Sequence, residues 1–210
     1  MKSIYLISAL LFVSNIFAQN NLPKNEFGLN LYNNEYEFGT VSNRSSLKHY
    51  SLTGFQYKRN INNGYLVRFL FNNKNESYSE SYADWIVAGG TTLSSGIIKT
   101  QDYKIGIERV FGSKKIKPFA FIDIGYSYFN NKGINARINS QSPASNNFDL
   151  TNHYINYVIG FGVKYYPTNH IYLSAETCIG YHRQIFDGNL NPNYAQLFNP
   201  ISTFVFGVRF

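Results

Sequence analysis

Apolar and polar residues alternate with a period of two along most of the chain beyond residue 25, which is the pattern of β-strands with one apolar face. In the stretch 153–167, Ile155, Tyr157 and Ile159 share one parity, while Asn156 and Gly160 share the other. The same alternation recurs in 65–71, 102–111, 118–129, 171–182 and 204–210, and it is weaker in 26–38 and 47–59. No helical stripe of useful length interrupts it, so the chain is predicted to be all-β with eight strands.

The links between the predicted strands alternate in length. The links 59–64, 112–117 and 167–170 are short and polar. The links at about 39–46, 78–97, 131–151 and 187–200 are long and rich in Asn, Ser and Gly, as flexible loops are. Short turns at one end and long loops at the other are typical of an antiparallel, up-and-down transmembrane β-barrel. An even strand number places both termini at the short-turn end, which is predicted to be periplasmic.

Alternation alone does not decide which face points into the barrel, since a secreted soluble barrel would place the apolar face inside. The interior of an eight-stranded barrel is only wide enough to be filled by side chains, so it cannot hold the Phe, Tyr and Ile of six strands. The opposite face is rich in small residues, namely Gly54, Gly106, Gly125, Gly160, Gly162, Gly180 and Gly207. We therefore predict that the apolar face meets lipid and that the mixed face fills the lumen.

The predicted lumen face carries charges of both signs. They come from Arg68, Lys104, Glu108, Asp123, Lys164 and Glu176, to which Lys58 and Arg209 can be added. Because buried charges must be paired, we expect these side chains to form a salt-bridged plug. The alternative is a gated polar path through the barrel.

The first twenty residues have the order of a secretory signal peptide, with Lys2 before the apolar stretch 4–13 and the small Ala18 after it. Cleavage after residue 18 would leave one β-barrel domain over 19–210. No later run of about 18 apolar residues occurs, which excludes a helical membrane protein. The single cysteine, Cys178, excludes an internal disulfide. The net charge of +7 is scattered, so anionic lipid headgroups are a better electrostatic partner than nucleic acid.

The last seven residues, FVFGVRF, place Phe204, Phe206, Val208 and Phe210 at alternate positions and end on an aromatic residue. This stretch resembles the last strand of bacterial outer-membrane proteins, and the resemblance implies that the barrel-assembly machinery recognises it. The size and strand number resemble the small OmpA/OmpX-like barrels, and the residue usage resembles barrel proteins of Bacteroidetes. The resemblance implies a bacterial outer-membrane location, contact with outer-membrane lipid and lipopolysaccharide, and a monomeric state.

Signals for catalysis or metal binding are weak. His49 and Ser51 have the His-x-Ser spacing of the PagL-type lipid A deacylases, in which a histidine can act as the base for a nucleophilic serine. The residues after Ser51 depart from the usual continuation in that family. The acidic residues Glu76, Glu80 and Asp84 fall in a predicted loop, where a solvated loop is favoured over a calcium site. No cofactor and no metal are expected.

Three functional hypotheses remain from the sequence. The first is a non-enzymatic outer-membrane barrel that stabilises the envelope or uses its long loops for binding or adhesion, since loops on a rigid scaffold commonly carry function. The second is a narrow channel for small solutes. The third is a lipid A-modifying hydrolase that uses His49 and Ser51.

Overall fold

The computed structural model describes residues 24–37, 46–62, 64–84, 90–112, 114–138, 144–186, 189–197 and 201–210. It contains nine strands, β1 (Asn25–Glu37), β2 (Ser46–Asn62), β3 (Tyr65–Asp84), β4 (Gly90–Val110), β5 (Ile116–Ile138), β6 (Ala144–Tyr165), β7 (Ile171–Phe186), β8 (Asn189–Leu197) and β9 (Ile201–Arg209). Among these residues no helix is long and apolar enough to cross a membrane. The predicted signal peptide, residues 1–18, lies outside the described residues.

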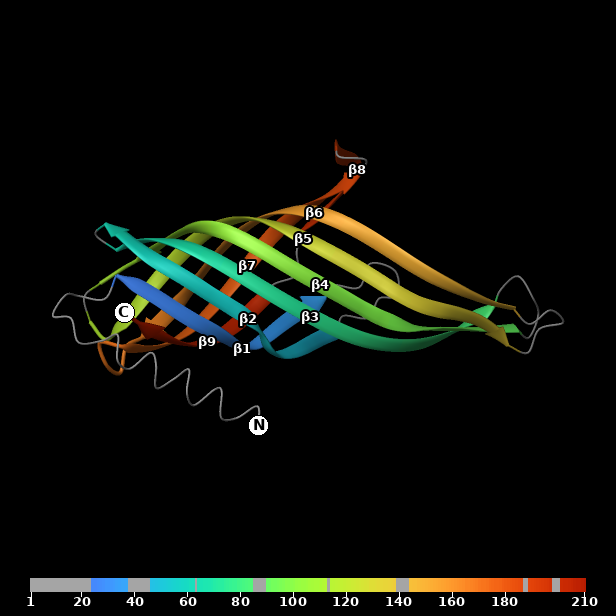
Figure 1. Cartoon of the computed structure of the whole chain (residues 1–210), viewed down its shortest axis with the longest axis horizontal. Coiled ribbons are helices and arrows are strands. Elements are labelled where there is room, and N and C mark those ends of the chain that lie inside the picture. The colour runs from blue at the N-terminus through green and yellow to red at the C-terminus, as the bar shows by residue number, and fades with distance from the viewer. Residues whose placement is uncertain are drawn as a thin grey trace.

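The strands form one closed antiparallel ring, shown in Figure 1. Each strand from β1 to β6 pairs with the next, β6 pairs with β7, β7 pairs with β9, and β9 returns to β1. β8 pairs only with residues 181–186 of β7, beyond the point where β7 leaves β9. Eight strands therefore make the barrel wall and β8 extends it. The prediction of an eight-stranded, up-and-down antiparallel β-barrel is confirmed.

The two faces of the wall differ sharply in chemistry. Many large apolar side chains are exposed on the outside, among them Ile105, Ile107, Ile122, Ile159, Phe161, Val163 and Phe204. Phe161 is 66% exposed, while its neighbour Gly160 faces the lumen and is buried. A continuous exposed apolar belt of this kind belongs against lipid, where a closed sheet satisfies every backbone group of the wall. The chain is thus built as a membrane-spanning barrel.

The barrel interior holds buried aromatic side chains that the sequence analysis did not anticipate. Phe119, Phe121 and Tyr172 are buried there. Glycines on the facing strands give them room, because a Cβ atom at Gly162 would collide with the ring of Phe119 and one at Gly207 with the ring of Tyr172. These glycines therefore leave the space that the buried rings occupy.

Four strands are much longer than their alternating segments predicted. β3 and β4 pair without interruption out to Asp84 and Gly90, and β5 and β6 pair out to Arg137 and Ala144. The long loops predicted at 78–97 and 131–151 are therefore wrong in large part, and β8 occupies much of the loop predicted at 187–200. Most side chains of these segments are exposed or half-buried, and polar residues predominate on them.

A bulge interrupts the pairing of β1 with β2. Leu31 has no partner in β2, and Leu52 has a φ of 50°, a left-handed conformation that residues other than glycine rarely adopt. Thr53 is buried directly beside Gly54, so the two-residue alternation slips at this point. A bulge cannot be read from parity alone.

Candidate functional site

All six of the charged residues predicted for the lumen are buried inside the barrel. They are Arg68 on β3, Lys104 and Glu108 on β4, Asp123 on β5, Lys164 on β6 and Glu176 on β7. Lys58 on β2 is also fully buried among them, and Arg209 on β9 is partly buried at the short-turn end. Each lies on the face opposite the lipid-facing side chains of its strand.

Glu108 is the centre of this cluster. Its carboxylate accepts a hydrogen bond from Lys58 Nζ at 2.6 Å and another from an Arg68 guanidinium nitrogen at 3.4 Å. Lys164 Nζ forms an ion pair with the second carboxylate oxygen. One carboxylate thus serves three cations from three other strands.

Arg68 links the cluster to the opposite wall. Its guanidinium donates to Glu176 at 3.1 Å and lies 3.2 Å from Asp123. It also sits 3.8 Å from the centroid of the Phe121 ring, a cation–π contact in a water-poor site. The side chain is 1% exposed, so these contacts replace its hydration.

Three lumen charges were missed by the sequence analysis. Glu26 on β1 accepts from Lys164 at 2.7 Å and from the Tyr166 hydroxyl at 3.0 Å. Lys74 and Asp102, nearer the other end, are 3.8 Å apart. Each has inward parity on its strand, but they lie at the ends of the alternating segments. Glu26 and Asp102 are the first residues of the segments 26–38 and 102–111, and Lys74 lies three residues beyond 65–71, so following the parity through these positions would have found them.

The middle of the barrel is filled. A cavity between Arg68, Lys104 and Cys178 measures 20 Å³, which is room for about one water molecule. The charged side chains and the rings of Phe119 and Phe121 occupy the remaining space around it. This arrangement holds the wall together from inside and leaves little room for a solute.

The residues proposed for chemistry do not form a described site. The side chains of His49 and Ser51 lie outside the described residues, as do that of Asp84 and the whole of Trp85. Glu76 and Glu80 belong to strand β3 and not to a loop, so the loop assignment is wrong for them. In the part of the chain that is described, no group of three or more His, Cys, Asp or Glu residues could hold a metal ion.

Beyond the apolar belt, β3 to β6 continue as a four-stranded sheet, which we call the projecting sheet (residues 73–84, 90–100, 130–138 and 144–152). It extends to one side of the barrel in Figure 1. The β2–β3 pairing ends at Gly54 and Asn72, and the β6–β7 pairing begins at His153 and Ile185. Among the described residues, 73–84 and 144–152 are therefore each unpaired on one side. The projecting sheet has two open edges.

An exposed ion pair marks the outer surface of the projecting sheet. Lys132 Nζ and an Asp149 carboxylate oxygen are 2.7 Å apart, with both side chains more than half exposed. The hydrogen bond from Lys132, and a second one from Asn130, lower the pKa of Asp149 below its usual value. The same bond raises the pKa of Lys132.

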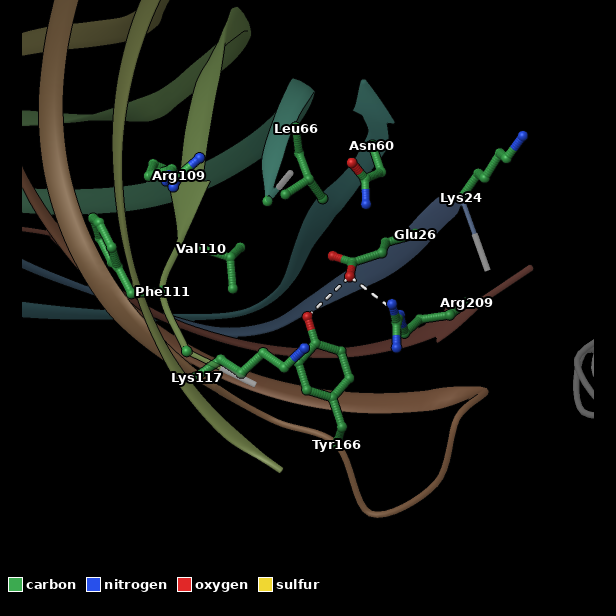
Figure 2. A pocket seen from close by; sticks show the side chains of 12 residues that line it. Lys24, Glu26, Asn60, Leu66, Arg109, Val110, Phe111, Lys117, Tyr166 and Arg209 are labelled. Atoms are coloured by element: carbon green, nitrogen blue, oxygen red, sulfur yellow. Dashed lines mark hydrogen bonds and ion pairs between the residues drawn. The ribbon is translucent and has the colours of Figure 1, made fainter. Parts of the chain in front are cut away.

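A larger cavity, of 360 Å³, opens at the short-turn end of the barrel and is shown in Figure 2. We call it the mouth cavity. Its polar lining comes from Lys24, Glu26, Asn60, Arg109, Lys117, Tyr166 and Arg209, and its apolar lining includes Leu66, Val110 and Phe111. Glu26 accepts from Tyr166 and pairs with Arg209 Nε at 3.3 Å across one wall of this space.

The C-terminal strand lies between β1 and β7. Phe204 is more than half exposed on the lipid side, and Phe210 is also exposed. The backbone of Phe210 exchanges hydrogen bonds with that of Asn25, at 2.8 and 3.0 Å. The ring is therefore closed through the last residues.

No family model and no curated protein matches this chain. Among solved structures it is similar to Ail, the attachment invasion locus protein of Yersinia pestis, with 14% identity over 90% of this chain and 100% of the other and a TM-score of 0.49. It is similar to Neisserial surface protein A, with 14% identity over 88% and 95% and a TM-score of 0.48. It is also similar to the outer membrane protein OprG from Pseudomonas aeruginosa, with 9% identity over 90% and 97% and a TM-score of 0.45. The structures it resembles are thus small outer-membrane barrels.

Proposed function

We propose that this protein is a non-enzymatic barrel of the bacterial outer membrane that presents the projecting sheet outside the cell as a binding platform. The observation that carries the proposal is the pair of open strand edges on a sheet that stands clear of the apolar belt. In this orientation the short turns and both termini face the periplasm, as in transmembrane barrels generally.

The open edges suit a partner that is itself extended. An unpaired strand offers a row of backbone N–H and C=O groups, to which an extended peptide can add as a further strand. The edge of β3 carries Glu76 and Glu80, and charged edge residues restrain indiscriminate edge-to-edge aggregation. Binding by strand addition to these edges is the mode that we propose.

The filled lumen supports a scaffold over a channel. The cluster around Glu108 occupies the centre of the barrel, and eight strands enclose only enough space for side chains. A conducting path would require the buried pairs to separate in a setting where unpaired charges are unfavourable. Catalysis by His49 and Ser51 has no support from the described side chains.

The proposal is tested by shortening the projecting sheet while keeping the barrel. The variant replaces residues 75–99 and 132–149 with two-residue Asn-Gly turns, because the flanking residues Lys74 and Thr100, and Asn131 and Leu150, are paired across their hairpins. Heat-dependent gel mobility and conductance in a planar bilayer are measured on both proteins, and adhesion of cells that display each protein is measured on extracellular-matrix surfaces. We expect both barrels to fold and to conduct no current, and only the full-length protein to support adhesion.

Two results would contradict the proposal. Discrete, steady current steps from the full-length protein would indicate a channel. Equal adhesion by the shortened protein would show that the projecting sheet does not carry the binding. A proline substitution at an open edge of β3, such as Ser79→Pro, is the finer test, because proline blocks strand addition without shortening the sheet.

A further inference from the structure

The mouth cavity is strongly cationic. Four basic side chains line it, Lys24, Arg109, Lys117 and Arg209, against the single carboxylate of Glu26. They come from the start of β1, the end of β4, the start of β5 and the end of β9, so four separate parts of the wall converge on one space. In Figure 2, Lys117 and Arg209 lie beside Tyr166, and the Lys24 side chain extends away from Glu26.

The one carboxylate in the mouth cavity is already fully engaged. Glu26 pairs with Lys164 at 2.7 Å, accepts from Tyr166 at 3.0 Å, and lies 3.3 Å from Arg209 Nε. Lys164 also pairs with Glu108 in the lumen, so Glu26 belongs to the buried cluster as well as to the mouth cavity. It therefore supplies no counter-charge to Lys24 or Lys117.

Two basic side chains of the lining, Lys117 and Arg209, share an aromatic ring. Lys117 Nζ lies 5.2 Å and the Arg209 guanidinium 4.5 Å from the centroid of the Tyr166 ring. Within the described residues, neither Lys117 nor Lys24 pairs with a carboxylate. A ring contact holds a cation in place without adding a counter-charge, so Lys117 keeps its charge uncompensated while Arg209 pairs with Glu26.

The surroundings reinforce this positive field. Arg59, Lys114 and Lys115 are exposed on the same rim. Among the described residues of 24–27, 59–66, 109–118, 165–172 and 207–210, Glu26 is the one acidic side chain. A cleft lined by charge of one sign concentrates ions of the opposite sign.

We propose that the mouth cavity is a binding site for a phosphate group. Guanidinium forks and lysine ammonium groups are the side chains best suited to phosphate oxygens. The volume of 360 Å³ lies near the lower end of the range of small-ligand pockets, roughly 300–1,000 Å³, so the ligand is small. The apolar wall of Leu66, Val110 and Phe111 fits the carbon skeleton of a glycerol or sugar ester.

Two sources could supply this group at the rim of a barrel. One is the headgroup of an anionic phospholipid in the adjacent leaflet, and the other is a soluble phosphate ester. The proposal does not depend on the function proposed for the projecting sheet, which lies at the opposite end of the molecule. The experiment distinguishes the two sources.

The test uses the full mature chain refolded in maltoside micelles, which contain no phosphate. Glycerol 1-phosphate is titrated and followed by calorimetry and by the NMR signals of the arginine Nε–H groups. In a parallel arm, phosphatidylglycerol is doped into the micelles, with diacylglycerol as the uncharged reference. The variants are Lys117→Gln and the double variant Lys117→Gln/Arg109→Gln.

Lys115→Gln is the matched control, because Lys115 carries the same charge on the same rim without lining the cavity. Loss of one charge-assisted hydrogen bond is expected to weaken binding about tenfold or more, so Lys117→Gln should bind at least that much more weakly. The double variant should show no saturable binding, and Lys115→Gln should match the parent. Gel mobility confirms that each variant is folded.

Either arm can support the site. Saturable binding of glycerol 1-phosphate assigns a soluble ester, while a response to phosphatidylglycerol alone assigns the lipid headgroup. No response in either arm, or an equal loss in Lys115→Gln and Lys117→Gln, overturns the proposal, because the latter result would reflect the general field of the rim.

Discussion

The substitution Glu108→Gln tests the charged lumen most directly. It preserves the shape of the side chain and removes its charge. Glu108 contacts Lys58 at 2.6 Å and Arg68 at 3.4 Å, and it also pairs with Lys164. All four side chains are almost completely buried. The change therefore leaves buried cations without their central partner.

The expected loss in the free energy of unfolding depends on which carboxylates still pair with the three cations in the Glu108→Gln variant. Lys164 keeps Glu26 at 2.7 Å, and Arg68 keeps its pair with Glu176 at 3.1 Å. Lys58 keeps only a distant contact with Glu176, at 4.0 Å. Removing one partner of a buried pair costs about 3–5 kcal/mol. Since mainly one cation is abandoned, we expect a single loss of that size in the free energy of unfolding.

The assay is equilibrium unfolding in urea from lipid vesicles, followed by far-ultraviolet circular dichroism and gel mobility. The double variant Glu108→Gln/Lys58→Met should recover more than half of the loss, because replacing both members of a buried pair by uncharged residues is often close to neutral. Lys132→Gln is the control; its partner Asp149 is exposed, so the free energy of unfolding should not change measurably.

A loss below about 1 kcal/mol for Glu108→Gln would refute the reasoning, since it would mean that the lumen is hydrated enough to solvate Lys58. Failure of the double variant to recover stability would also count against it. In that case the loss would come from packing and not from the unpaired ammonium group.

Three further predictions follow from other parts of the barrel. Gly207→Ala places a Cβ atom against the buried ring of Tyr172 and should cost about 1–3 kcal/mol in urea unfolding; an equal cost in a Tyr172→Ala background would contradict this cause. The hydrogen bond from Lys132 lowers the pKa of Asp149, so this pKa, measured by carboxyl NMR, should rise in Lys132→Gln. Because the folded pKa is lowered, the charged Asp149 stabilises the folded sheet above the unfolded pKa, and this contribution is lost as the pH falls through the folded pKa. An unchanged titration in Lys132→Gln would exclude the bond in solution. Deletion of Phe210 should impair insertion by the assembly machinery in cells while the purified barrel still refolds, and normal surface levels of the truncated protein would exclude the assembly-signal role.

The sequence predicted the barrel wall well because the wall separates two different environments. Residues that face lipid are apolar and residues that face the lumen are small or polar, so Ile105 and its neighbour Lys104 indicate which face of the strand points outward and which inward. The projecting sheet lies beyond the apolar belt, and its stretch 78–84 shows no alternation, so that stretch was predicted to belong to a loop. Physical signals for strands fade where neither face must be apolar.

The sequence analysis predicted the charged residues of the lumen but not its buried aromatic residues. Arg68 and Glu108 stand out as charges between apolar neighbours, whereas Phe119 and Phe121 look like further lipid-facing residues unless their parity is followed. The mouth cavity was not predicted at all. Lys24, Lys117 and Arg209 are far apart in the sequence, and only closure of the ring brings them together.

The pairing of β1 with β9 also has a consequence for the order of folding. Every other wall contact joins neighbouring strands, but this one joins residues near opposite ends of the chain, so its loop-closure entropy must be overcome late. The cross-lumen bonds Lys164–Glu26 and Arg68–Glu176 span 138 and 108 residues and bring together distant strands of the ring. A closure out of register would leave these charges mismatched inside a dry interior. The buried cluster can therefore stabilise the native register of the first and last strands over closures that leave its charges unpaired.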